Sequence, residues 1–118
     1  MSSPGPHPEQ RRCKRWHLVF YLRAFEAGSE RLLGHVVDIN HQGMKLISDV
    51  ALPTGQNFRL WLDVPLEDGG RERLHLHARS LWSQPDVNPD FYDTGFELLE
   101  PSPETVLKIQ LLIDDLRL

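Results

Sequence analysis

The chain has 118 residues, a formal net charge of −4 at pH 7 and one cysteine, which is enough for a single domain with one core and excludes an internal disulfide. The acidic charge disfavours binding to polymeric nucleic acid, and the lone cysteine is typical of a reducing cytoplasm. No apolar run approaches the ~20 residues that a membrane span needs, so we expect no membrane insertion.

The N-terminal region divides into a polar tail and a basic arm. Residues 1–9 contain Pro, Gly, Ser and polar side chains but no apolar residue after Met1. Such a segment cannot offset its ordering entropy by burial, so we predict a flexible tail over residues 1–9 and one domain over residues 10–118. The basic arm, residues 11–15, reads RRCKR in a chain that is otherwise acidic. This local positive charge predicts an anionic ligand.

Strand patterns begin at Trp16. Apolar residues alternate with a period of two from Leu18 to Ala24, and Phe58 to Leu66 form the longest apolar face of this kind. Turn sequences such as EAGSE and EDGG separate the runs, as antiparallel hairpins require. We predict six strands, which cover approximately residues 16–24, 31–40, 44–48, 57–66, 71–82 and 92–99.

The C-terminal residues change to a helical pattern. Ser102 is an N-cap, Pro103 suits the first helical position, and Glu104 favours the positive end of the helix dipole. Leu107 and Leu111 widen the apolar stripe and are candidates for contact with a partner. Six strands and one helix predict an all-β fold with a C-terminal helix, a six-stranded antiparallel barrel. The stripe that we expect to pack on the barrel comprises Val106, Ile109, Leu112, Ile113 and Leu116.

Polar residues end the second predicted strand. Asp38 and Asn40 are two positions apart, so a strand through both directs both side chains to the same face. Gly43 follows at a position where a turn needs a positive φ or where a ligand approaches the backbone closely. Asp and Asn also favour turns for local reasons, and from this segment alone both interpretations stay open.

Two short motifs carry a family resemblance. Arg11 and Arg15 form R-x-x-x-R, and residues 38–43 form D-x-N-x-x-G. Together they resemble the two signature motifs of the PilZ domain family, in the same order and with a similar separation. The later segments LW and YDTGFEL also resemble the closing strands of that family. The resemblance covers residues 10–118 and implies a six-stranded barrel with a C-terminal helix, in agreement with the predicted elements.

The ligand of the family is cyclic di-GMP, and the resemblance implies a role for each motif residue. Arg11 and Arg15 would offer planar donor groups to phosphate or guanine, and Arg12 would add attraction to the phosphates. Asp38, when ionised, would accept from the N1–H and N2–H₂ donors of guanine, a pattern that adenine lacks. Asn40 stands where the family usually has Ser or Ala, and its amide either crowds the base or hydrogen-bonds the ligand.

Two tryptophans and two histidines have both a structural and a functional interpretation. Trp82 either stacks on a bound guanine or packs at the rim of the barrel. Trp61 has the parity of the polar residues of its strand, so we expect an exposed aromatic on the outer surface. His75 and His77 share a face without a third ligand at a suitable spacing, so we expect them to face solvent and predict no metal site.

The combined prediction is a bacterial, cytoplasmic receptor or adaptor that binds cyclic di-GMP and changes its N-terminal arm and surface to regulate a protein partner. We expect no cofactor besides this ligand and no enzyme, because no activated nucleophile, metal-ligand set or paired carboxylates stand out. Two alternatives stay open. One is a PilZ-like adaptor that bridges protein partners without nucleotide; the other is a barrel for single-stranded nucleic acid, against which the acidic charge argues.

Overall fold

The structure, a computed structural model, describes residues 16–116 and the side chains of residues 21–115. The predicted tail and the basic arm lie outside the described residues. Six strands and one helix follow one another along the chain, as the sequence pattern predicts. Their bounds are β1 Trp16–Glu26, β2 Leu32–Ile39, β3 Gly43–Ser48, β4 Asn57–Pro65, β5 Arg71–Pro85, β6 Tyr92–Leu98 and α1 Pro103–Leu116.

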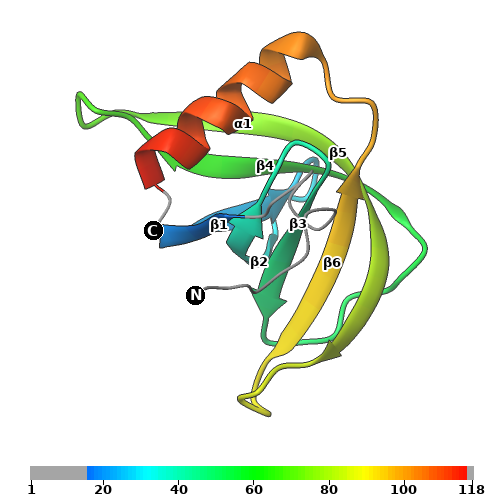
Figure 1. The fold of residues 1–118 in the computed structure, drawn as a ribbon. Helices are drawn as coiled ribbons and strands as arrows, with labels where there is room; N and C mark the ends of the chain where they lie inside the picture. The colour runs from blue at the N-terminus through cyan, green and yellow to red at the C-terminus, as the bar shows by residue number, and fades with distance from the viewer. Residues whose placement is uncertain (1–15, 117–118) are drawn as a thin grey trace, which may run out of the picture.

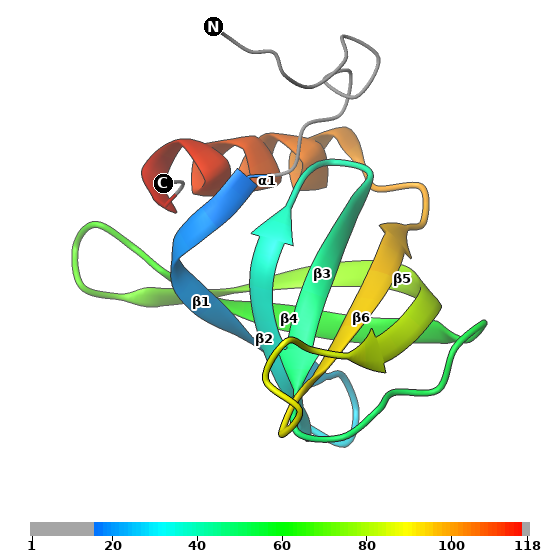
Figure 2. The ribbon, with the colours of Figure 1, turned by 60° about the horizontal axis from the view of Figure 1, so that its bottom comes forward.

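The six strands close into one antiparallel barrel. Their order around the barrel is β1-β2-β3-β6-β5-β4, so the chain runs through β1, β2 and β3 and then crosses to β4 before β5 and β6 fill the gap. Figures 1 and 2 show α1 lying across one end of the barrel, over the long β4–β5 hairpin. This arrangement confirms the predicted barrel with its C-terminal helix.

Alternation in β4 and β5 builds one wall of the core. His75 and His77 face solvent, as predicted, while the residues between and beside them point inward. Burial of each such large apolar side chain contributes about 1.5–3 kcal/mol. The face of β4 ends at Val64; Leu66, predicted to continue it, is 41% exposed in the following turn. The buried residues Leu74, Leu76 and Ala78 of β5 pair in register with Leu62, Leu60 and Phe58 of β4.

The helix begins at its predicted cap and packs on the barrel through one face. Ser102 Oγ accepts a hydrogen bond from the backbone N–H of Thr105 at 3.1 Å, as an N-cap does. Leu107 and Leu111 remain 58% and 53% exposed, so the apolar stripe is wider than the face that the barrel covers. Among the helix residues with described side chains, the buried ones are Ile109, Leu112 and Ile113.

Trp61 corrects one expectation. It lies on the outer face of β4, as its parity predicts, but it is only 7% exposed. Phe25 of β1 stacks on its ring with the centroids 4.3 Å apart, the Arg73 guanidinium lies 3.9 Å from the ring centroid, and Nε1 donates to Glu30 at 3.2 Å. Parity determines the face to which a side chain points, whereas its exposure depends on what neighbouring strands place over it.

A buried carboxylate joins three strands where the barrel closes. Asp63 of β4 accepts a hydrogen bond from Nε of Arg71 in β5 at 2.7 Å and forms an ion pair with Arg23 of β1. The hydrogen bond from Arg71 lowers the pKa of Asp63 from its ordinary 3.8, against the opposing effect of burial, and Arg23 lowers it further. The contribution of this cluster to folding stability is present above the ordinary pKa of 3.8 and is lost as the pH falls through the lowered pKa of Asp63.

Candidate functional site

A one-residue bulge in β2 turns Asp38 to the outer face of the barrel. Val36 pairs with Leu46 of β3, but Asp38 pairs with the next residue back, Lys45, so Val37 is an extra residue in β2. An extra residue shifts the in-out alternation by one position. Val36 therefore stays in the core, completely buried, and Asp38 joins Lys45 on the outside.

A second bulge in β5 does the same for Trp82. Ser80 pairs with Phe96 of β6, and Trp82 pairs with Gly95, so Leu81 is the extra residue. Ser80 is completely buried, whereas Trp82 is 38% exposed. If Leu81 paired regularly with Gly95 instead of being an extra residue, simple alternation would place Trp82 on the same inward face as Ser80. The bulge thus presents the indole on the outer surface.

The two bulges align four residues in one row across four strands. Asp38, Lys45, Gly95 and Trp82 are successive cross-strand partners on β2, β3, β6 and β5. At about 4.8 Å between neighbouring strands, the row spans roughly 14 Å. Nζ of Lys45 lies 3.8 Å from Oδ2 of Asp38, whose side chain is largely buried. The row therefore offers an anionic acceptor at one end and an aromatic surface at the other.

Gly95 provides the place for the Trp82 indole. A Cβ at position 95 would lie 2.4–2.6 Å from the indole atoms Cε2, Nε1 and Cζ2, well inside van der Waals contact. The indole therefore lies against bare backbone of β6. Trp82 thus packs on the barrel, which agrees with its structural interpretation. It also keeps an exposed surface on which a base can stack.

We expect the substitution Gly95→Ala to displace the Trp82 indole, because the added methyl group occupies the same space. The NMR resonance of the Trp82 indole N–H should shift, while that of Trp61, held by Phe25 and Glu30, should not. Trp61 is thus an internal control, and Trp82→Phe identifies the Trp82 signal. An unchanged Trp82 resonance in Gly95→Ala would show that the indole does not rest on Gly95 in solution.

Two carboxyl groups lie beside the row. Burial raises the pKa of Asp93, and its hydrogen bond with Asp86 raises it further. The backbone N–H of Asn88, which donates to Asp86 at 2.9 Å, lowers the pKa of Asp86. The two groups therefore differ in proton affinity, and Asp93 holds the proton more tightly. Lys45 attracts both carboxylates as well as Asp38, which keeps its ammonium group within this cluster.

Asn40 organises the turn between β2 and β3. Its Oδ1 accepts hydrogen bonds from the backbone N–H groups of Gln42 at 2.7 Å and Gly43 at 2.9 Å. This is the local turn role that the sequence left open. Gly43 begins β3, and it is not among the described glycines with positive φ, which are Gly28, Gly55 and Gly69. Positive φ is therefore not the reason for glycine here, and close approach of a ligand stays a prediction.

We expect Asn40→Ala to lower the free energy of unfolding by about 1–3 kcal/mol, since the buried backbone N–H of Gly43 and the partly buried one of Gln42 lose their acceptor. Asn40→Ser retains a side-chain oxygen at a similar place and should restore most of the loss. Urea denaturation of both variants measures the difference. Equal stability of the alanine variant and the parent would contradict the turn role.

The structure places the predicted site residues unequally. Arg11, Arg12 and Arg15 lie outside the described residues, but His17 of β1 pairs with Asp38, so the chain enters the barrel beside that carboxylate. The sequence analysis did not identify Lys45 or Gly95 as site residues, because only the strand register brings them into the row. Among the described residues, no group of three His, Cys, Asp or Glu could hold a metal ion, and no helix has the length and hydrophobicity to cross a bilayer.

Solved structures share this architecture. The inhibitor of motility MotI (DgrA) of Bacillus subtilis aligns with a TM-score of 0.71 and 17% identity, over 93% of this chain and 55% of that one. The PilZ domain of Escherichia coli YcgR with c-di-GMP aligns with 0.65 and 19%, over 91% of both chains. YcgR in complex with c-di-GMP aligns with 0.65 and 18%, over 90% of this chain and 45% of that one. The chain spans about half the length of MotI and of that YcgR.

The family assignment comes from the sequence itself. A search of curated protein sequences found no match. The model of the PilZ domain, however, matches residues 9–115, which include the basic arm, all six strands and most of α1. Together with the closed barrel and its structural neighbours, this match confirms the resemblance carried by the two motifs. The chain belongs to the PilZ domain family.

Proposed function

We propose that this protein is a bacterial cytoplasmic receptor that binds cyclic di-GMP on the outer face of the barrel and regulates a protein partner. The observation that carries the proposal is the row from Asp38 to Trp82, which begins where the chain bearing Arg15 enters β1. Membership of the PilZ family supports it. The two YcgR structures of similar fold are complexes with c-di-GMP.

Each end of the row suits a different part of the ligand. The Asp38 carboxylate accepts from the paired N1–H and N2–H₂ donors of guanine, and its burial strengthens those hydrogen bonds. Lys45 forms an ion pair with Asp38 at 3.8 Å. Trp82 offers an exposed ring for stacking, and Arg11 and Arg15 supply forked donors for phosphate and for the O6/N7 edge of guanine. Each of these contacts is one of recognition, as expected for a receptor.

Isothermal titration of the full chain with cyclic di-GMP tests the proposal and gives affinity and stoichiometry together. We expect saturable binding in the micromolar range or tighter, and chromatography of the mixture should recover intact nucleotide. No binding would contradict the proposal and favour the adaptor that bridges protein partners without nucleotide. A linear product would contradict the assignment as a receptor without enzymatic activity.

We expect Arg15→Ala to weaken cyclic di-GMP binding at least tenfold, because charge-assisted hydrogen bonds contribute roughly 1.5–3 kcal/mol each. Arg15→Lys should restore little of the affinity, since an ammonium group lacks the planar fork. Arg31→Ala is a matched control, because Arg31 is exposed at the β1–β2 turn and pairs only at 3.4 Å with Glu26. Isothermal titration measures all three variants. If Arg15→Ala or Arg15→Lys bound cyclic di-GMP as tightly as the parent, the role of Arg15 would be contradicted.

A further inference from the structure

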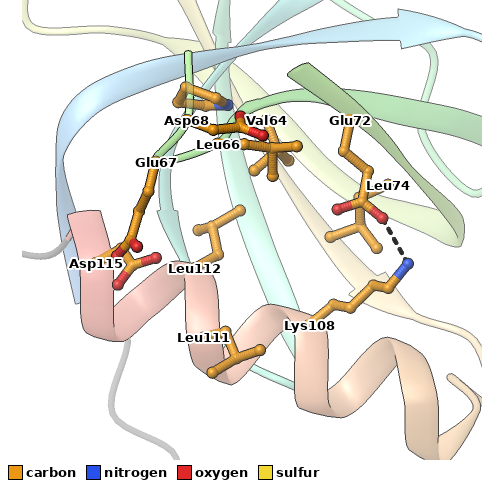
Figure 3. Close-up of a pocket in the computed structure, with 11 residues that line it drawn as sticks. Val64, Leu66, Glu67, Asp68, Glu72, Leu74, Lys108, Leu111, Leu112 and Asp115 are labelled. Atoms are coloured by element: carbon orange, nitrogen blue, oxygen red, sulfur yellow. Dashed lines mark hydrogen bonds and ion pairs between the residues drawn. The ribbon is translucent and has the colours of Figure 1, made fainter. Parts of the chain in front are cut away.

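An apolar groove runs between α1 and the end of the β4–β5 hairpin. Its volume is about 430 Å³, within the range of ligand-binding pockets. Figure 3 shows the leucines of the hairpin and helix directed into it and carboxylates along its rim. Two of the leucines, Leu66 and Leu111, are 41% and 53% exposed. We call it the α1 groove; its apolar lining is Val64, Pro65, Leu66, Leu74, Leu111 and Leu112.

The charges around the α1 groove are unbalanced. Lys108 is the only cation in its described lining, and its Nζ is engaged by Glu72 at 2.6 Å and by Glu104 at 3.7 Å. At the other end, Figure 3 shows Glu67 of the hairpin turn and Asp115 of α1 pointing toward one another. Two facing carboxylates repel each other, and a cation between them would remove that repulsion.

The C-terminal end of α1 also favours a cation in the α1 groove. Its last turn carries acidic residues, among them Asp114 and Asp115, and no basic residue. The C-terminal end of a helix has a partial negative charge, so acids there are unfavourable and cations favourable. A basic segment seated in the groove would therefore be attracted by the helix end as well as by Glu67.

The chain itself supplies such a segment at this place. In Figures 1 and 2 the beginning of β1 lies beside the last turn of α1, and α1 contacts β1. The fifteen residues before β1 include the basic arm, residues 11–15, which holds four cations in five residues. Fully extended, five residues reach about 17 Å, and α1 with its fourteen residues is about 21 Å long. The basic arm can thus lie along much of the groove.

We propose that, without nucleotide, the basic arm occupies the α1 groove, with its guanidinium groups between Glu67 and Asp115. The aliphatic stems of its Arg and Lys side chains would cover Leu66 and Leu111, as long cationic side chains do on apolar surfaces. Cys13, a small apolar residue, suits the same floor. This proposal deepens the proposed function and rests on it for one step: cyclic di-GMP draws the arginines to Asp38 and so uncovers the groove for a protein partner.

Cys13 is the single cysteine of the chain and allows the test in the full-length protein. A nitroxide attached to it should broaden the amide resonances of residues 66–68 and 111–115 in the absence of nucleotide. With saturating cyclic di-GMP these resonances should recover, and those around Asp38, Lys45 and Gly95 should broaden instead.

The double substitution Glu67→Lys with Asp115→Lys separates arm docking from mere proximity. Both residues are exposed, and lysine at 115 suits the helix dipole, so the fold should persist. Broadening at the groove should then disappear. Asp49→Lys with Asp90→Lys makes the same change in net charge at two exposed loop positions and should leave the broadening in place.

Nucleotide affinity provides a second readout. Docking in the groove competes with the nucleotide site, so the apparent dissociation constant exceeds the intrinsic one by the inverse of the undocked fraction. If the arm is docked about nine-tenths of the time, the groove variant should bind cyclic di-GMP about tenfold more tightly. The control pair, compared at the same ionic strength, measures the part of any change that net charge alone causes.

Three results would overturn the proposal: no broadening at the groove in the free protein, equal broadening in the groove variant, or broadening that persists with saturating nucleotide. A mixed sample would contain nitroxide-labelled protein without isotope enrichment and isotope-enriched protein without nitroxide. Broadening of the groove resonances in this mixture would assign the groove to the arm of a second copy and would also overturn the proposal. If the free protein shows the groove contact but cyclic di-GMP does not bind, docking stands and the proposed function fails, so the two are distinguishable.

Discussion

Replacing Asp38 by alanine is expected to weaken cyclic di-GMP binding tenfold to a hundredfold and to remove most of the preference over cyclic di-AMP. A buried carboxylate that accepts from guanine contributes roughly 1.5–3 kcal/mol per charge-assisted hydrogen bond, and each ~1.4 kcal/mol is a factor of ten. Adenine presents no matching pair of donors, so the parent should bind cyclic di-AMP far more weakly. A site with a buried polar group rejects a ligand that leaves it unpaired.

The control for this result is Asp90→Ala, a change at an exposed loop carboxylate, which should titrate like the parent. Asp38→Asn adds a sharper comparison, because its amide keeps one acceptor oxygen but turns a donor toward the guanine donors. It should bind cyclic di-GMP almost as weakly as the alanine variant. Equal affinity of the parent for the two nucleotides would remove Asp38 from base recognition.

Replacing Leu112 by alanine is expected to lower the free energy of unfolding by about 2–5 kcal/mol, the range for a buried leucine that leaves a cavity. Leu112 is 4% exposed and belongs to the core beneath α1. For a domain of this size each kilocalorie shifts the midpoint of thermal unfolding by roughly 4 °C, so the melting temperature should fall by about 8–20 °C.

Leu107→Ala is the matched control, since it removes the same atoms from the same helix at a position that is 58% exposed. It should change stability by no more than about 0.5 kcal/mol. Thermal unfolding followed by circular dichroism measures both variants. Similar midpoints for the two would show that α1 does not rest on the barrel through Leu112.

Local sequence patterns were enough to predict the elements of the barrel. In β5, Leu74 and Leu76 alternate with His75 and His77 without interruption, and this period of two is an intrinsic property of an extended chain. Ser102 likewise marks the beginning of α1 through a hydrogen bond within one turn. Such features depend on residues that are close in sequence, so the sequence alone carries them.

Other features depend on which strands become neighbours. Lys45 meets Asp38, and Gly95 meets Trp82, only because β3 pairs with β2 and β6 with β5 in one particular register. Trp61 is buried by Phe25 of a strand that is distant in sequence. The sequence motifs pointed to Asp38 and raised stacking by Trp82, but no local pattern shows what lies between them.

The extra residue Leu81 changes how related sequences should be compared. A relative that lacks one residue between Ser80 and Trp82 would have uninterrupted alternation, and its tryptophan, directly after the inward serine, would still face outward opposite Gly95. A relative of the same length in which the residue at position 81 pairs with Gly95 would instead turn its tryptophan toward the space now taken by the contact between Ser83 and Thr94. The register of β5 against β6, and not residue identity alone, therefore separates proteins with an exposed ring from proteins without one.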